Sequence, residues 1–415
     1  MHQAQVNTNS THFRRNWVGF FLLGLSNMLP YAMVSAAANS IARSYHKEGF
    51  VATVYGAAGS TTIVVKLLNT FVLTRVSYNI RFTTNTLVLL LGIAGVAYAP
   101  TFITAIFAVV IVGASYAFGE NLALGYLSKF DSRLVNAWSS GCGCAGLISA
   151  LFVIAAGCLI KPTLDKASDL KEVDWYSFLA CCPFVFLYLI AYLMVIVEAP
   201  GESALHQVNG YSVNAAHVTD DNPSTEQDSL LGHEQSLSQG EPRRLTMSDR
   251  WHCFKLIWKL GVNLAIATFA TFVCRVASAK AEDKTKYDQV CPELFVSLQL
   301  CFQAAQFASL SSVQHIKIRR VHVLAAIQFI NAVIWIFNTV YKFMPVYILP
   351  AYMVIIGLIM GAIYVNTFYM VHNDDIFPTE HRDLLANMTG TFLTVGVSLC
   401  SILMTVLYKT VLVNY

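Results

Sequence analysis

Residues 102–127 read FITAIFAVVIVGASYAFGENLALGYL, and this stretch decides the fold class. A helix needs about 20 mainly apolar residues to cross a bilayer, because each residue adds about 1.5 Å. Lipid offers no partners for backbone N–H and C=O groups, so an apolar stretch of this length must satisfy them internally as a helix. The stretch therefore predicts a transmembrane helix, with Glu120 as its one charged residue.

The rest of the chain repeats this pattern. Of the 415 residues, 56% are hydrophobic and 12% are charged, whereas soluble domains average about 25% charged residues. The mean hydropathy of +0.55 agrees. We predict an all-α integral membrane protein with about eleven transmembrane helices. The predicted spans are 17–39, 51–74, 83–100, 102–127, 136–160, 175–197, 254–278, 293–313, 321–341, 346–371 and 386–412.

One long polar segment divides these spans. Residues 198–253 are rich in Ser, Asn, Gln, Asp and Gly and show no hydrophobic period, which is typical of a disordered loop. The loop separates an N-terminal six-helix bundle, 17–197, from a C-terminal five-helix bundle, 254–415, and a short tail, 1–16, precedes the first span. Two helical bundles in one chain is a layout of secondary transporters.

Basic residues near the span ends predict the orientation. Arg14 and Arg15 precede the first span, and Arg319 and Arg320 precede a later one on the same side. Cytosolic ends carry the excess of Lys and Arg, so we expect the N-terminal tail and the long loop in the cytosol. An odd number of spans then places Tyr415 on the luminal side. The net charge of +3 gives no reason to expect a nucleic-acid partner.

The ten cysteines are scattered, mostly within apolar runs, so we expect small buried side chains rather than a disulfide framework. Cys142 and Cys144 have no second pair and no nearby histidines, which argues against a metal site. No nucleophile–base pair, HExxH motif or phosphate-binding glycine loop is apparent. We therefore expect no metal, no cofactor and no enzymatic activity.

A short motif in the long loop predicts where the protein goes. Residues 226–231 read EQDSLL, which fits the acidic dileucine pattern [DE]xxxL[LI] through Glu226, Leu230 and Leu231. Clathrin adaptor proteins bind such segments as extended peptides, with the leucines in an apolar pocket and the acidic residue on a basic patch. The motif predicts delivery to endosomes and lysosomes. The alternative is a chance leucine pair in a polar linker.

Several stretches resemble the battenin family, which is implicated in juvenile neuronal ceroid lipofuscinosis. They are VGFFLLGLSN at 18–27, FGE at 118–120, WSSGCGCAG at 138–146, GAIYVNTF at 361–368 and EHR at 380–382. The resemblance implies a fold like that of the major facilitator superfamily and residence in the lysosomal membrane. It also implies export of glycerophosphodiesters, with further links to lysosomal pH and arginine handling.

The chain departs from the family pattern at three places. Thr271 stands where the seventh span of the family has a glutamate, and Leu310 replaces an arginine of the eighth. If those charges hold substrate in the family, this chain binds its substrate differently. The sequence ends in Val413–Tyr415 without the cysteine of a prenylation box, so lipidation there is not expected.

Charged residues at membrane depth are the first candidates for a transport site, because burying a charge in lipid is costly. Lys66 and Glu120 fall at similar depth, so we expect them to pair or to face a shared cavity. A glutamate in such a cavity can couple proton movement to a conformational change. The alternative is an ion pair that only fixes two helices together.

The family fold lines its central cavity with the first, fourth, seventh and tenth spans. By resemblance, the cavity candidates are Asn27, Glu120, Asn121, Asn263, Arg275, Tyr364 and Asn366. A phosphodiester needs a cation or clustered donors, which Arg275 could supply. The alternative for Arg275, near the end of its span, is a side chain that reaches the luminal interface.

Two further patterns concern helix faces. Gln299, Gln303 and Gln306 share one face of the eighth span and could line a polar route or hydrogen-bond to neighbouring helices. Gly141, Gly143 and Gly146 predict close helix packing.

Three functions stay open. The first is a lysosomal exporter of small phosphodiesters, with or without coupling to protons. The second is a transporter of a basic amino acid such as arginine, or a regulator of lysosomal pH. The third is a membrane trafficking scaffold that acts through the long loop.

Overall fold

The structure, a computed structural model, describes residues 2–62, 64–65, 76–127, 130, 132–160, 167–197, 247–281, 294–311, 317–374, 376–378 and 382–411. These residues form helices and short connections, and the described part contains no strand. Ten of its helical segments are long and apolar enough to cross a membrane. The predicted span at 51–74 is described as far as residue 65 and begins with α3 (Val51–Ser60). The predicted all-α membrane architecture is therefore confirmed.

The helices fall into two sets along the chain. The N-terminal half comprises α1 (His2–Ala36), α2 (Ala38–Ser44), α3, α5 (Tyr78–Ala97), α6 (Phe102–Leu127), α7 (Val135–Ile160), α8 (Ala167–Leu179) and α9 (Cys182–Ile190), which ends in the π-helical turn Ala191–Val195. The C-terminal half comprises α11 (Met247–Ala277), α13 (Leu294–Ser311), α14 (Val321–Tyr341), α15 (Leu349–Asn373) and α16 (Arg382–Thr410).

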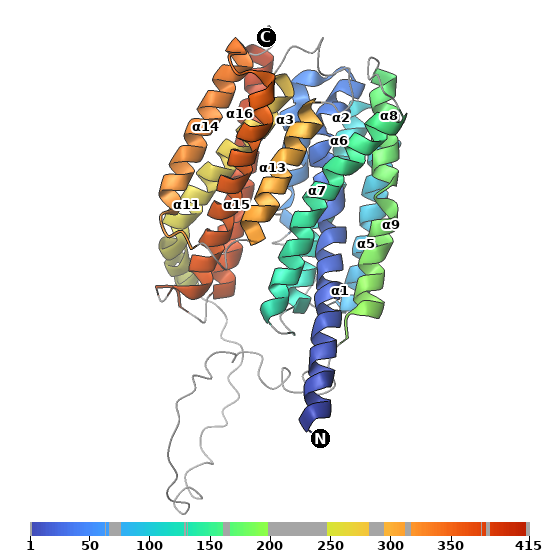
Figure 1. Cartoon of the computed structure of the whole chain (residues 1–415), viewed down its shortest axis with the longest axis vertical. Coiled ribbons are helices and arrows are strands. Elements are labelled where there is room, and N and C mark those ends of the chain that lie inside the picture. Colours follow the sequence, from blue (N-terminus) through green and yellow to red (C-terminus); the bar gives the residue numbers. More distant parts are fainter. Residues whose placement is uncertain are drawn as a thin grey trace, which may run out of the picture.

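Figure 1 shows the two halves side by side, with their long helices running between two ends of the molecule. We call the end where α1 begins the amino-terminal end, and the end where α16 finishes the carboxyl-terminal end. The helices alternate in direction, so the chain starts at one end and finishes at the other (Figure 1). This is the arrangement expected for an odd number of spans.

Close glycine contacts hold α1 against α7. A Cβ atom at Gly24 would collide with the backbone carbonyl of Trp138, and one at Gly141 would collide with the carbonyl of Phe21. Small residues let helix backbones approach closely in membranes, where apolar burial alone gives no preference for protein over lipid. The prediction that Gly141 serves close packing is confirmed.

Two seams join the halves. In the first seam, α3 lies against the last turns of α16, at the carboxyl-terminal end. The hydroxyls of Thr53 and Thr405 share a hydrogen bond of 3.1 Å. The Ser401 hydroxyl donates to the backbone carbonyl of Ala52 at 2.7 Å. In the second, α7 meets α13, where a Cβ at Gly143 would touch Phe307 and one at Gly146 would touch the Gln303 amide. The first seam is joined by hydroxyl groups, whereas the second sets two glycines of α7 against Phe307 and Gln303 of α13.

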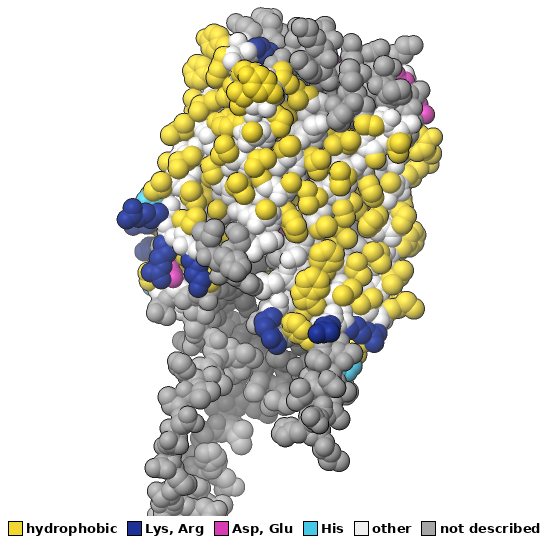
Figure 2. Space-filling view, in the orientation of Figure 1, with side chains coloured by type: hydrophobic (Ala, Val, Ile, Leu, Met, Phe, Trp, Pro, Cys, Tyr) yellow, Lys and Arg dark blue, Asp and Glu magenta, His cyan; other side chains and the backbone are white. Residues whose placement is uncertain are grey.

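The outside of the molecule matches a bilayer. Figure 2 shows hydrophobic side chains covering the flank between the ends, and Lys and Arg gathered near the amino-terminal end. Exposed apolar residues such as Ile103 and Phe107 form part of this flank. The exposed basic residues at the amino-terminal end include Arg14, Arg15, Arg133, Arg250, Lys255, Lys317, Arg319 and Arg320. At the opposite end of the described chain, Lys47 and Lys409 are the exposed basic residues.

One cysteine departs from the sequence expectation. Cys158, in the last turn of α7, is disulfide-bonded. The other cysteines of the described residues are free thiols, half-buried or buried among apolar neighbours, as expected. The apolar setting of Cys158 in the sequence concealed its position at the end of the span, where a disulfide can form.

Candidate functional site

Tyr31 lies within electrostatic range of two charged groups of the membrane-spanning helices, Glu120 and Arg275. It is on α1 of the N-terminal half, and both the Glu120 carboxylate and the Arg275 guanidinium act electrostatically on its hydroxyl. Glu120 lies on α6 of the same half, whereas Arg275 lies on α11 of the other. These residues belong to both halves, and we call the set of Glu120, Tyr116, Tyr31 and Arg275 the polar axis.

Tyrosines surround the Glu120 end of the polar axis. The Tyr116 hydroxyl lies 3.4 Å from the Glu120 carboxylate, one helical turn away, and the Tyr116 ring stacks on Tyr31 with centroids 4.6 Å apart. The Glu120 charge also acts on the hydroxyl of Tyr364, on α15 of the C-terminal half, and on the thiol of Cys142. Glu120 is half-buried, so its carboxylate faces residues of both halves rather than acyl chains alone.

Arg275 forms the other end of the polar axis. Its side chain is only 5% exposed, which contradicts the alternative that it reaches the luminal interface. Its Nε donates to the Gln299 amide oxygen at 2.8 Å. The guanidinium lies 4.8 Å from the ring centre of Phe302 and 5.2 Å from those of Tyr55 and Phe272, distances of cation–π contacts. Tyr55 belongs to the N-terminal half, so the cage is shared by both halves.

The remaining cavity candidates occupy varied places. Lys66 lies outside the described residues, so its pairing with Glu120 stays a prediction. Asn27 is fully buried within the N-terminal half and donates to the Tyr116 carbonyl at 3.1 Å. Asn121, next to Glu120, and Tyr364 are half-buried. Gln303 reaches the seam between α7 and α13.

Two candidate asparagines bond to nearby backbone. Asn263 donates to the carbonyl of Lys259, one turn earlier in its own helix. Asn366 accepts from the backbone N–H of Ile318 at 2.7 Å and donates to Ala362 at 2.8 Å. Both sets of contacts stay within the C-terminal half.

A buried hydrogen-bond network includes Thr271, the position at which the resemblance to the battenin family led us to expect a glutamate. The Thr271 hydroxyl accepts from the Gln328 amide at 2.8 Å, Asn331 lies 3.4 Å from Gln328, and Tyr352 donates to Asn331 at 2.9 Å. These partners come from three helices far apart in the sequence, which is why sequence reasoning missed them. Thr271 thus ties α11 to α14.

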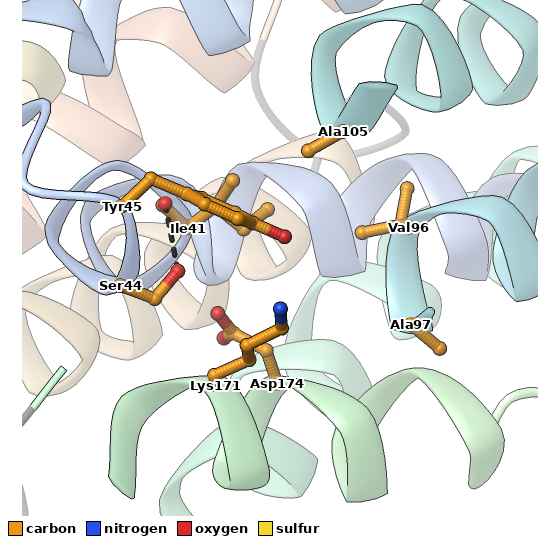
Figure 3. A pocket seen from close by; sticks show the side chains of 8 residues that line it. All are labelled: Ile41, Ser44, Tyr45, Val96, Ala97, Ala105, Lys171 and Asp174. Carbon is orange, nitrogen blue, oxygen red and sulfur yellow. Dashed lines mark hydrogen bonds between the residues drawn. The ribbon is translucent and has the colours of Figure 1, made fainter. Parts of the chain in front are cut away.

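A separate pocket lies inside the N-terminal half near its carboxyl-terminal end. Figure 3 shows Lys171 and Asp174 of α8 facing Ser44, the last residue of α2, and Tyr45, which follows it. Burial, and then the Asp174 carboxylate, raise the pKa of Tyr45 above its usual value. The volume of ≈ 10 Å³ leaves room for about one water molecule, too little for a transported solute.

The described residues contain no group of three or more His, Cys, Asp and Glu side chains that could hold a metal ion. What the polar axis offers is one acid, one guanidinium and several aromatic hydroxyls between two helical halves. Such a set can bind a small charged molecule and move a proton, but it shows no nucleophile with a base.

Comparisons with known proteins identify the family of this chain. The family model described as CLN3 protein matches residues 18–414. The chain belongs to the CLN3 family. Battenin of Dictyostelium discoideum is 29% identical, with 97% of this chain and 96% of that protein covered. Battenin of the dog, Canis lupus familiaris, is 24% identical, with 94% and 89% covered. The resemblance inferred from the sequence is confirmed.

A solved structure supports the fold of this CLN3 family member. The structure is that of a bacterial homologue of the human lysosomal transporter Spinster, in an inward-facing and unoccupied conformation. The two structures superpose with a TM-score of 0.54 over 93% of this chain and 81% of the bacterial chain. At 13% identity this likeness shows the fold alone. This chain therefore shares the helical fold of that structure.

Proposed function

We propose that this protein is a lysosomal membrane transporter that exports glycerophosphodiesters from the lumen to the cytosol. The observation that supports this most is the polar axis, which places Glu120 and Arg275 on opposite sides of the interface between the halves. Transporters of this layout bind their substrates at the interface between repeats and rock the two halves about it. A phosphodiester is an anion, and Arg275 supplies a cation at that interface.

Two observations support a luminal carboxyl-terminal end. Exposed Lys and Arg gather at the opposite end, as expected of a cytosolic face. Cys158 is disulfide-bonded at the carboxyl-terminal end, and disulfides persist in oxidising compartments rather than in the cytosol. With this orientation, α1 begins in the cytosol and the seam between α3 and α16 closes the luminal side.

The lysosomal address rests on the motif at Glu226, Leu230 and Leu231, which lies outside the described residues. We propose that clathrin adaptor proteins bind it. Replacing both leucines by alanine should move the protein to the cell surface without changing transport by the purified protein. Mislocalisation of a 201–250 deletion, with transport kept, would argue against the trafficking scaffold.

Proteoliposomes test the transport proposal directly. Purified protein should move labelled glycerophosphoglycerol faster than protein-free vesicles, and an inward-acidic pH gradient should change the rate if Glu120 couples protons. Metabolite profiles of lysosomes with and without the protein should show phosphodiesters retained in its absence. Transport of arginine, with no movement of phosphodiesters, would instead support the basic amino acid alternative.

A further inference from the structure

The surroundings of Arg275 hold its guanidinium in one orientation. Gln299 is fully buried, and its amide oxygen accepts from Nε at 2.8 Å. The amide nitrogen of Gln299 lies 3.3 Å from the Ser278 hydroxyl and 3.4 Å from the backbone carbonyl of Arg275. The amide nitrogen of Gln299 is therefore fixed by the backbone of Arg275 and by Ser278, three residues later in the chain. This fixed geometry is what a guanidinium needs to present its terminal N–H groups in a set direction.

The guanidinium lacks a counter-charge within the described part of the chain. Its Nη2 is buried and makes no hydrogen bond, and Arg275 forms no ion pair there. The rings of Tyr55, Phe272 and Phe302 surround the cation; the Tyr55 hydroxyl donates to the carbonyl of Ser35 at 2.8 Å and lies beside the guanidinium, but it is neutral and supplies no counter-charge. Burying a charge without a hydrogen-bonded partner of opposite sign is costly, so an anion that reached Nη2 would relieve that cost.

The cage is built from both halves of the molecule. Tyr55 follows Thr53 by two residues on α3, in the luminal seam against α16, whereas Phe272 and Phe302 belong to the C-terminal half. Rocking the halves apart on the luminal side would separate Tyr55 from Arg275 and expose the guanidinium to the lumen. Closing the seam would return Tyr55 and cover a bound anion. Arg275 therefore lies where a luminal substrate would first be held.

We propose that Arg275 is the residue that binds the phosphodiester anion of the substrate, with Gln299 positioning it and Tyr55 closing over it. This inference rests on the proposed function. Two terminal N–H groups of a guanidinium match two oxygens of one phosphate group, and the single charge of a phosphodiester balances one arginine. Arg275 is thus a specificity residue for a monoanion, at the luminal end of the polar axis.

The test uses the full chain in nanodiscs and glycerophosphoglycerol, which carries a phosphodiester and no cation. The variants are Arg275→Gln and Arg275→Lys. The matched control is Arg81→Gln, because Arg81 is 7% exposed and lies over the rings of Tyr78 and Phe118 within one half. Ligand binding is read as the dissociation constant from thermal-shift titrations, with glycerol and free arginine as comparison solutes.

Wild type and Arg81→Gln should bind glycerophosphoglycerol alike. Arg275→Gln should weaken binding by about 10- to 100-fold, as expected for loss of a charge-assisted hydrogen bond, with Arg275→Lys in between. Equal binding by Arg275→Gln and wild type would overturn the inference, as would Arg275-dependent binding of arginine alone.

Phosphodiester flux in proteoliposomes tests the role of Arg275 and the proposed function separately. Phosphodiester transport by wild type that persists unchanged in Arg275→Gln contradicts the role of Arg275 and leaves the proposed function standing. No phosphodiester transport by wild type contradicts the proposed function itself. If Arg275→Gln does not fold, as judged by its elution and melting profile, Arg275→Lys and Gln299→Leu carry the test, and both should weaken binding.

Discussion

A covalent lock across the luminal seam should stop transport. The Thr53 and Thr405 hydroxyls are 3.1 Å apart and belong to different halves. In the double variant Thr53→Cys with Thr405→Cys, oxidation should form a disulfide, since hydroxyls this close place the two Cβ atoms near the spacing a disulfide needs. A disulfide keeps its two Cα atoms within about 6.8 Å, so the seam could no longer open.

The expected size of the effect follows from the cross-linked fraction. Because each locked molecule cannot expose its site to the lumen, 90% cross-linking should leave about one tenth of the rate. Cross-linking is measured as the loss of maleimide labelling at positions 53 and 405, in a background whose native free cysteines are replaced by serine. Phosphodiester flux is measured on the same vesicles, and a reductant should restore it.

A matched pair within one half provides the control. Thr101 and Thr104 also have hydroxyls 3.1 Å apart, at the turn between α5 and α6. A disulfide between cysteines at these two positions should leave transport unchanged. Full transport by molecules shown to be cross-linked at 53 and 405 would refute the reasoning that this seam must open.

Three further outcomes are expected. Gly141→Ala should destabilise the protein by about 1–3 kcal/mol, because the new methyl group meets the backbone of α1, whereas Gly49→Ala should be neutral in thermal melting since no atom lies near a Cβ there. Thr271→Val should cost about 1–3 kcal/mol in the same assay, because it leaves the buried Gln328 amide without its hydroxyl partner. Glu120→Gln should abolish the response of flux to a pH gradient while the protein stays folded, and an unchanged response would exclude Glu120 as the proton carrier.

The sequence predicted the fold well because the bilayer imposes simple rules. Apolar runs of span length, Arg14 and Arg15 before the first span, and the glycines of α7 each follow from local chemistry. Gly141 illustrates this, since a glycine inside an apolar run has few other reasons to be there. Sequence motifs spread along the whole chain then identified the family.

The site was predicted less completely because its contacts are long-range. Arg275 looked like an interfacial side chain, since its distance from the span end is short and its neighbours in sequence are apolar. The residues that bury it, Tyr55 and Phe302, come from other helices. Tyr31 was missed because a tyrosine in an apolar span has no distinctive pattern. Asn366, by contrast, was chosen from a motif, and its amide bonds to backbone within one half.

The bond at Cys158 has a consequence for how the protein is made. In the orientation proposed above, it can close only after the end of α7 has reached an oxidising compartment, so it would form only on molecules inserted that way round. A chain threaded backwards would keep that sulfur as a thiol facing glutathione. The oxidation state of this cysteine therefore indicates, for each molecule, whether α7 was inserted in the correct direction. Thiol-specific labelling could separate correctly inserted molecules from the others before any substrate is added.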